Sequence, residues 1–171
     1  IRTQAEWSLS RAAEETGVSK AMLGQIERNE SSPTIATLWK IAKGFHKPLS
    51  VFIDDTVIAN DDSVVRKYSN SFTPQESDLK ANILFPFDPR FGFEVFLISL
   101  EPGQTHHSEA HDKGVFEHIM VVEGEIEMKL KDQWNTIATG DVLRFPADES
   151  HSYRNKSSEK IALFHDIICY K

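Results

Sequence analysis

Apolar residues recur at helical spacing in the N-terminal third of the chain and at strand spacing after it. Three short segments of that third carry apolar residues three or four positions apart, which places them on one face of a helix. Ser8, Ser19 and Ser32 each stand before such a segment, where a hydroxyl caps a helix, and a proline follows the third serine. Gly17 and Gly44 close the first and third segments. The pattern predicts three helices that follow these serines.

Beyond Val64 the pattern changes to that of strands. Segments rich in Val, Ile and Phe alternate or run apolar, and Gly, Pro and Asp separate them. The predicted strands span residues 91–100, 116–123, 125–130, 134–138, 142–145 and 160–170. Several short strands at this spacing are typical of a β-sandwich or barrel. The acidic run 54–63 has the composition of a linker, so we expect a helical domain over residues 1–53 and a β domain over 64–171.

The second predicted helix has one face without apolar residues. This face carries Lys20, Ala21, Gly24, Gln25 and Arg28, which are small or able to form hydrogen bonds. Such a helix, joined to its predecessor by a tight glycine turn, fits the major groove of DNA. The alternative is a plain helical bundle whose polar residues form a solvated face. The pattern favours double-stranded DNA as a partner.

Charge and composition narrow the partners further. Residues 1–52 hold seven Lys and Arg against five Asp and Glu, whereas the rest of the chain holds 12 against 21. Because the net charge is −7, affinity for DNA has to come from a local patch and should fall with salt. We expect a cytoplasmic protein without a membrane partner, since no apolar run has spanning length and no secretory signal opens the chain. Cys169 has no partner for a disulfide, and Ile1 falls within a predicted helix tail, so upstream residues are expected to be missing.

The run from Val18 to Ala42, VSKAMLGQIERNESSPTIATLWKIA, resembles the XRE family of bacterial and phage repressors of the lambda and Cro type. The resemblance implies an all-α, lambda-repressor-like helix-turn-helix domain. It also implies that Lys20, Ala21 and Gln25 face base edges, with Gln25 able to pair bidentately with adenine. The residues that it places near phosphates are Ser10, Ser19, Arg28, Asn29 and Lys40.

Two passages in the β region resemble the motifs of the cupin family, whose fold is an all-β double-stranded β-helix, a jelly-roll barrel. Residues 140–155, GDVLRFPADESHSYRN, follow the second cupin motif G-x5-P-x-G-x2-H-x3-N, with Asp148 in place of a glycine. Residues 103–124 follow the first motif, G-x5-H-x-H-x3,4-E-x6-G, with two departures. Glu109 stands where the first histidine is expected, and one extra residue precedes Glu117. The chain therefore resembles a helix-turn-helix domain followed by a cupin.

The cupin resemblance also implies a metal site. His111, Glu117 and His151 match motif positions that supply imidazole and carboxylate ligands. Glu109 is the expected fourth ligand and His107 its alternative, because residues two apart on a strand point to the same side. We expect a divalent metal, with zinc favoured over iron, manganese or nickel. If no metal binds, these side chains are structural or contact a ligand directly.

A subset of the apolar residues of the barrel is expected to line a ligand pocket beside the metal. The predicted pocket residues are Phe93, Met120, Arg144, Phe145 and Tyr153. A helix-turn-helix followed by one cupin resembles bacterial transcription regulators whose barrel senses a small metabolite. FPFDP at residues 85–89 and HDKGVFEH at 111–118 are similar to the sulfur-utilisation type of this class.

This resemblance implies a homodimer on a pseudo-palindromic operator, with a small-molecule effector such as a sulfur-containing amino acid. The alternative is an enzyme. Hydroxypropylphosphonate epoxidase, a metal-dependent cupin oxygenase, also carries a helix-turn-helix domain, and His111, Glu117 and His151 would then form its iron-binding triad. The DNA-competent second helix and the lack of an obvious basic cluster in the barrel favour a regulator that is not an enzyme.

Overall fold

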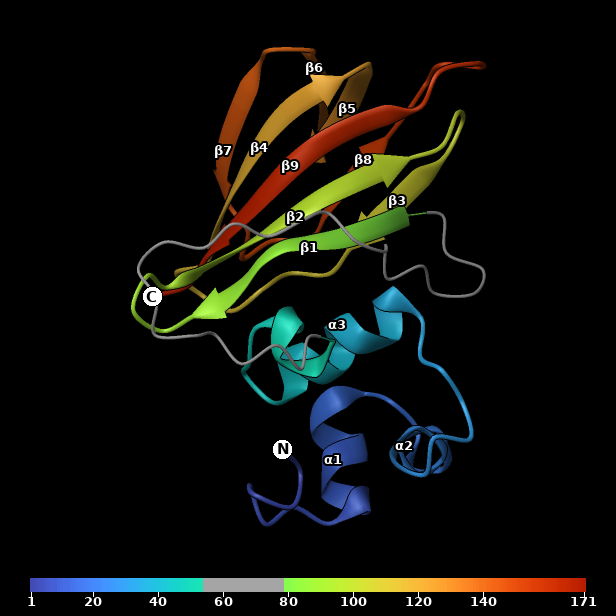
Figure 1. Ribbon diagram of the computed structural model, residues 1–171, viewed down its shortest axis with the longest axis vertical. Coiled ribbons are helices and arrows are strands. Elements are labelled where there is room, and N and C mark those ends of the chain that lie inside the picture. The colour runs from blue at the N-terminus through green and yellow to red at the C-terminus, as the bar shows by residue number, and fades with distance from the viewer. Residues whose placement is uncertain (54–78) are drawn as a thin grey trace.

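The computed structural model describes residues 1–53 and 79–171 and places a small helical head against one end of a β-barrel (Figure 1). The head contains α1 (Leu9–Thr16), α2 (Lys20–Glu27), α3 (Ile35–Gly44) and the 3-10 turn η1 (Leu49–Phe52). The predicted linker, residues 54–63, lies outside the described residues. No helix of the described ranges is long and apolar enough to cross a membrane.

The first two helices begin and end where the sequence pattern predicts. The Ser8 hydroxyl accepts a hydrogen bond from the backbone N–H of Arg11, and the Ser19 hydroxyl accepts one from Met22. Each bond satisfies a backbone donor that a helix leaves free at its N-terminus. Gly17 ends α1 with φ of 67°, a left-handed conformation that glycine adopts without strain. The predicted caps of the helix-turn-helix are confirmed.

The third helix begins later than predicted but ends at Gly44, as predicted. Its cap is Thr34 rather than Ser32, because the Thr34 backbone is extended and its hydroxyl accepts from the backbone N–H three residues on. Gly44 is the last helical residue but is not in a left-handed conformation; the positive φ, 50°, belongs to His46. A Cβ at Gly44 would lie 2.6 Å from the Cα of Thr16. Glycine is therefore needed at this position so that α1 and α3 can pack closely.

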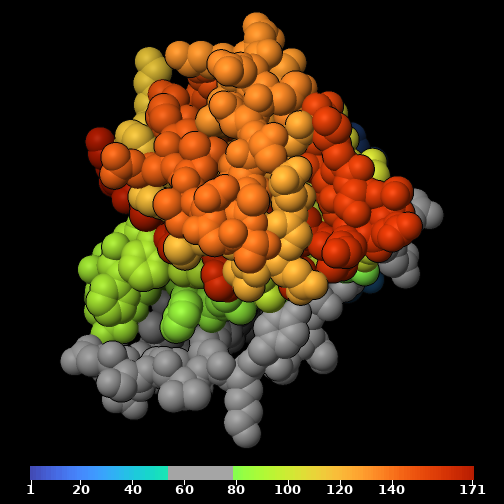
Figure 2. Space-filling view, turned by 90° about the horizontal axis from the view of Figure 1, so that it is seen from above, coloured from blue at the N-terminus to red at the C-terminus, as the bar shows by residue number. Residues whose placement is uncertain are grey.

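The barrel consists of two antiparallel sheets, with strand orders β1-β2-β9-β4-β7 and β3-β8-β5-β6. The strands are β1 (Leu79–Asp88), β2 (Phe93–Leu100), β3 (Thr105–Ser108), β4 (Phe116–Glu123), β5 (Glu125–Leu130), β6 (Gln133–Ala138), β7 (Val142–Pro146), β8 (His151–Arg154) and β9 (Ala162–Cys169). This interleaved order is that of a jelly-roll barrel, so the predicted fold class is confirmed. Viewed from the end away from the head, barrel atoms cover the surface and the helices lie almost wholly behind them (Figure 2).

The helix α3 contributes side chains to two hydrophobic cores. Ile41 packs in the core of the head with Ala12, Val18 and Leu23. Three other residues of the same helix, Ile35, Leu38 and Ala42, belong to the main core of the barrel. Burial of these side chains holds the head against the barrel by the hydrophobic effect. The orientation of α3 therefore links the position of the head to the packing of the barrel.

A buried carboxylate forms a second junction between the two parts. Glu94 of β2 is fully buried, and its oxygens accept from the backbone N–H groups of Leu49, at 3.2 Å, and Ser50, at 2.9 Å. The hydroxyl of Tyr170 donates to the same carboxylate at 2.5 Å. These bonds satisfy the first N–H groups of η1, which have no partner within the turn. The C-terminal end of the head is thus fastened to the barrel.

Candidate functional site

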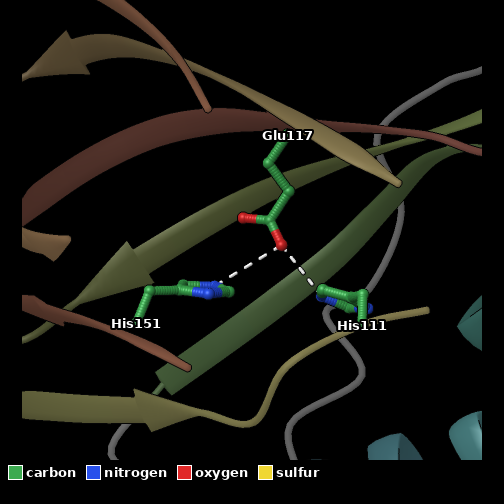
Figure 3. Close-up of side chains that lie close together, drawn as sticks. All are labelled: His111, Glu117 and His151. Carbon is green, nitrogen blue, oxygen red and sulfur yellow. Dashed lines mark ion pairs between the residues drawn. The ribbon is translucent and has the colours of Figure 1, made fainter. Parts of the chain in front are cut away.

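Three side chains that are distant in sequence meet inside the barrel (Figure 3). His111 comes from the loop after β3, Glu117 from β4 and His151 from the start of β8, and one ligand atom of each lies within 4.8 Å of the others. Glu117 Oε1 is 2.8 Å from His111 Nε2 and 3.5 Å from His151 Nε2. The structure therefore brings together the three residues that match the cupin motifs.

Strand periodicity explains why Glu117 faces inward although it is charged. It shares the inner face of β4 with the buried Ile119 and Val121, two and four residues on. His118 consequently points outward, where its Nδ1 lies 3.8 Å from Cys169 Sγ. Glu117 pairs with Phe145 of β7, and this pairing fixes the register of β4. A carboxylate at this depth requires partners of opposite charge or a metal.

Hydrogen bonds hold the backbone of His111 and the imidazole of His151 at the cluster. The backbone N–H of His111 donates to the carbonyl of Ala147 at 2.8 Å. Nδ1 of His151 lies 3.1 Å from the carbonyl oxygen of Glu149. Because a carbonyl only accepts, this nitrogen carries a proton, and Nε2 is the one available to a metal. The imidazole of His151 is thus held by its surroundings, as metal-ligating histidines usually are.

The hydroxyl of Tyr153 donates to Glu117 Oε2 at 2.8 Å and lies 3.0 Å from His151 Nε2. Burial, and then the nearby charge of Glu117, raises the pKa of Tyr153 well above its ordinary value, so the hydroxyl stays protonated and keeps donating. This bond occupies one carboxylate oxygen and leaves the other, Oε1, facing the imidazoles. Tyr153 therefore orients the carboxylate.

The electrostatics of the cluster keep Glu117 ionised. Burial by itself raises the pKa of Glu117, but the interactions with His111 and His151 outweigh it and bring the pKa below the usual range. Burial lowers the pKa of His151, and the nearby carboxylate of Glu117 more than reverses this, so the net shift is upward. A negative oxygen thus lies between two imidazole nitrogens.

The residues of this cluster fit a divalent metal. Glu117 Oε1 is buried and accepts no hydrogen bond of acceptable geometry from any described residue, although two imidazole nitrogens lie near it. A cation held by Oε1 and the two Nε2 atoms would satisfy that oxygen. Two imidazoles and one carboxylate suit zinc and the first-row transition metals, and three protein ligands leave positions open for water or another molecule.

The structure does not bring either predicted fourth ligand to the cluster. Strand β3 ends at Ser108, so the alternation argument that placed Glu109 inside the barrel does not apply. The Glu109 side chain is 62% exposed, and its carboxylate lies 3.6 Å from Lys40 Nζ. Nδ1 of His107 lies 2.8 Å from the hydroxyl of Ser152. Among the residues the structure describes, the metal-ligand cluster has three members.

The predicted pocket residues divide between the inside and the outside of the barrel. Phe145 and Tyr153 are buried beside the cluster, and the ring centroid of Phe145 is 5.0 Å from that of His151. Phe93, Met120 and Arg144 each adjoin an inward residue on their strand, so they lie on the outer face and do not reach the site. Alternation along a strand separates its two faces but does not say which face is inner. Our assignment of these three residues to the inner face was incorrect.

A cavity of about 590 Å³ opens over the cluster, between α3 and the mouth of the barrel. His111 and His151 form part of its wall, and Trp39 of α3 forms another part. The Trp39 ring meets the His111 ring edge-on, with centroids 4.8 Å apart. Sequence reasoning did not find this role of α3, because no local pattern reveals which surfaces of two domains pack together.

The predicted DNA-reading surface is exposed on α2 and its flanks. Lys20, Ala21 and Gln25 are exposed on the helix, and Asn29 adopts the left-handed conformation after it, with φ of 56°. Gly24, predicted on the same face, is instead buried beneath Arg28. The predicted phosphate-contacting residues that are likewise exposed are Ser10, Ser19 and Arg28.

Lys40 differs from the other predicted phosphate contacts. It projects from α3 into the cavity over the barrel, where it pairs with Glu109. Its side chain is therefore directed at the barrel, away from the surface that α2 presents. The physical reason is that Lys40 lies one helical turn from Ala36 and from Lys43, and all three line the cavity.

Comparisons with known proteins agree with both parts of the fold. Residues 1–52 match a helix-turn-helix family and residues 96–168 match the cupin domain family. The chain is 46% identical over 170 residues to the HTH-type transcriptional regulator SutR of Escherichia coli (strain K12), which covers 99% of this chain and 90% of that protein.

Two solved structures agree with this assignment. A crystal structure of an HTH_3 family transcriptional regulator from Vibrio cholerae is 38% identical with a TM-score of 0.82, over 99% of this chain and 90% of that one. The Cupin_2 domain of an XRE family transcriptional regulator from Enterobacter cloacae is 39% identical with a TM-score of 0.53, over 56% of this chain and 99% of that one. The chain belongs to the XRE family of helix-turn-helix transcriptional regulators that carry a C-terminal cupin domain.

Proposed function

We propose that this regulator senses a small metabolite at a metal-containing pocket in its cupin domain and adjusts its binding to DNA accordingly. The observation that carries the proposal is the cavity over His111, Glu117 and His151, because α3 of the DNA-binding head forms part of its wall. An occupant of that cavity would contact both domains at once. A ligand with different affinity for two poses of the head shifts the balance between them.

Zinc is the metal that the donor set favours for a sensor. The two imidazoles and the carboxylate would hold it, and its open positions would accept a ligand atom without redox chemistry. A sulfur-containing amino acid is the effector we favour. A thiolate is a strong zinc ligand, and the segments at residues 85–89 and 111–118 resemble the sulfur-utilisation type of regulator.

DNA binding would take place in the cytoplasm through a homodimer on a pseudo-palindromic operator. Two α2 helices would enter successive major grooves about 34 Å apart. In each, Gln25 would read adenine through its side-chain amide, while Lys20 and Ala21 contact neighbouring base edges. The residues that would contact phosphates are Ser10, Ser19, Arg28 and Asn29.

A metal-dependent oxygenase is the second candidate, because two histidines and one carboxylate are also the ligand set of non-haem iron oxygenases. The cavity does contain lysines, which weakens the sequence argument that the barrel lacks a basic cluster. The exposed reading surface on α2 and the close relatedness to transcriptional regulators support a regulator without enzymatic activity.

Metal content of untagged protein purified without chelator distinguishes these readings. We expect close to one zinc per chain by mass spectrometry, lost in His111→Ala and retained in the matched control Glu109→Gln. Iron lost in the same way would favour the oxygenase. No metal in any of the proteins would contradict the metal-containing pocket.

The regulatory step is tested by fluorescence anisotropy with an operator fragment selected from random DNA. We expect L-cysteine or a related sulfur amino acid to change the dissociation constant by about 5- to 150-fold, the usual range of allosteric coupling. If neither L-cysteine nor any related sulfur amino acid changes the dissociation constant, the sensor proposal is overturned. If no sequence is bound in preference to random DNA, the assignment of α2 as the reading helix fails as well.

A further inference from the structure

The cavity between α3 and the barrel has cationic side chains on both walls. Lys40 and Lys43 line it from α3, while Lys129 and Lys131 line it from the end of β5 and the turn to β6. Resting on the sensor function proposed above, we infer that this cavity is a binding site for a small anion shared by the two domains. The anion would join α3 to the barrel above the metal cluster.

The charge balance of the walls supports an anionic occupant. The lining acidic residues are Glu109, 3.6 Å from Lys40, and Asp132, 3.5 Å from Lys129. Neither Lys43 nor Lys131 forms an ion pair within the described part of the chain. The walls thus keep an excess of positive charge, although the whole chain has a net charge of −7. A concave site of one sign concentrates ions of the other sign.

The tendency of lysine to lie on protein surfaces does not by itself explain why these lysines gather around one cavity. They come from two segments nearly 90 positions apart in the sequence and line the cavity over the cluster, in which Glu117 Oε1 has no hydrogen-bond partner among the described residues. Lys131 lies in the two-residue turn between β5 and β6, with φ of 55°, and lines the cavity from that turn. The site therefore offers a metal position at its base and cations at its rim.

This arrangement suits a molecule with a donor atom at one end and an anionic group at the other. The donor atom would reach the metal position beside His111, and the anionic group would lie between Lys43 and the lysines of the barrel. Thiol-bearing carboxylates have both features. A cationic amine would be repelled by the rim, so charge rather than the thiol alone would decide affinity.

Occupancy would restrain α3, and through it the reading head. Trp39 contacts His111 in the barrel, and two residues along the same helix Ile41 packs with Leu23 of α2. An anion bound to Lys43 and to the barrel would hold this helix in one orientation. The pose of α2 relative to the barrel would then differ between the free and the occupied protein.

Fluorescence quenching of Trp39 in the full chain tests the anion preference without knowledge of the effector. The substitutions Trp7→Phe and Trp134→Phe remove the other two tryptophans and keep an aromatic ring where Trp7 stacks on Phe45 and where Arg154 lies over Trp134. The quenchers are iodide, caesium and neutral acrylamide, at constant ionic strength.

We expect iodide to quench Trp39 more strongly than caesium, and the variant Lys43→Gln/Lys129→Gln to lower iodide quenching at least about twofold without changing acrylamide quenching. The matched control Lys160→Gln removes an exposed lysine that does not line the cavity and should behave like the parent. Iodide quenching that is the same in parent and double variant would overturn the inference. Circular dichroism verifies that each variant is folded.

Calorimetry of the zinc-loaded chain tests the ligand class with two thiols of opposite charge. We expect 3-mercaptopropionate to bind about tenfold more tightly than cysteamine, and Lys43→Gln/Lys129→Gln to remove most of this difference, because two exposed ion pairs are worth about that factor. Equal binding of the two thiols, or no binding of either, would contradict the anion site. If the anion site is absent, the protein still binds its operator. If the proposed function is wrong, the protein does not prefer any DNA sequence, or no metabolite changes its affinity for DNA.

Discussion

The neighbouring helices α2 and α3 belong to the same small head, but their polar sides face different surroundings. The polar side of α2 is exposed, with Gln25 and Lys20 directed to solvent. The polar side of α3 lies over the barrel, with Lys40 and Lys43 at the cavity. One helix therefore presents the surface suited to DNA and the other the surface suited to a ligand. Leu23 of α2 and Ile41 of α3 lie in the same core of the head, which links the two helices.

The two cores differ as much as the two helices do. The core of the head contains few buried side chains, whereas the main core extends through the barrel and takes in part of α3. A small core supplies little stability by itself. The head therefore depends on its packing against the barrel, and a change at that boundary should affect the whole chain more than a change on α2.

The largest expected effect comes from emptying the boundary between α3 and the barrel. Leu38→Ala removes a side chain that is 5% exposed within the main core, so we expect a loss of about 2–5 kcal/mol in the free energy of unfolding. Met22→Ala on α2 is the control, since Met22 is 38% exposed, and should cost about 0.5 kcal/mol or less. Urea unfolding measures both. A small loss for Leu38→Ala would mean that α3 does not pack on the barrel in solution.

A glycine in each helix sharpens the same comparison. A Cβ at Gly44 would lie 2.6 Å from the Cα of Thr16, so Gly44→Ala should destabilise the protein by about 1–3 kcal/mol. At Gly24 of α2 the nearest atom is Nη1 of the Arg28 side chain, at 3.1 Å, which is able to move away. Gly24→Ala should be neutral or stabilising by up to about 1 kcal/mol, because alanine favours the helix. Thermal unfolding that ranks the two variants the other way would contradict the packing of α1 on α3.

The bounds of a helix or strand could be predicted from the sequence where one periodicity or one capping residue determines them. Strands β4 and β5 have their predicted bounds, because β4 contains the apolar run IMVV, β5 alternates as EIEMKL and Gly124 separates them, and Ser8 and Ser19 cap as expected. The convergence of His111, Glu117 and His151 could be predicted from the motif spacing. In contrast, β3 and β8 read THHS and HSYR, and such polar runs carry no alternation of apolar residues.

Other features depend on contacts that no local pattern encodes. Alternation shows that Met120 and Ile119 face opposite sides of β4, but only the position of the core tells which side is inner. Strand β1 contains a proline and two register shifts in its pairing with β2, which obscure its period. The cavity required knowledge of how α3 docks on the barrel. The docking joins residues far apart in sequence, so it could not be predicted from either segment alone.

Substitutions on the two helices should separate base reading from ligand contact. Gln25→Ala on α2 should cost about 1–3 kcal/mol in binding a specific operator and little in binding random DNA. Arg28→Gln should weaken both and lower the salt dependence by about one counterion. Lys40→Gln on α3 should change that salt dependence less than Arg28→Gln does, since Lys40 faces the barrel. DNA titrations at several salt concentrations measure the salt dependence of the affinity. Equal salt dependence for the Arg28 and Lys40 variants would show that Lys40 contacts DNA.

The smallest expected effect concerns the ion pair between α3 and the barrel. Lys40 and Glu109 lie 3.6 Å apart, with side chains 46% and 62% exposed, so water and salt screen their attraction. Glu109→Gln should therefore change the free energy of unfolding by no more than about 1 kcal/mol. The same variant should retain its metal, whereas Glu117→Gln should lose it, because only Glu117 places a buried oxygen between the two imidazoles. Metal lost from Glu109→Gln would show that the loop after β3 moves inward on metal binding, and that the Lys40 contact then gives way to coordination.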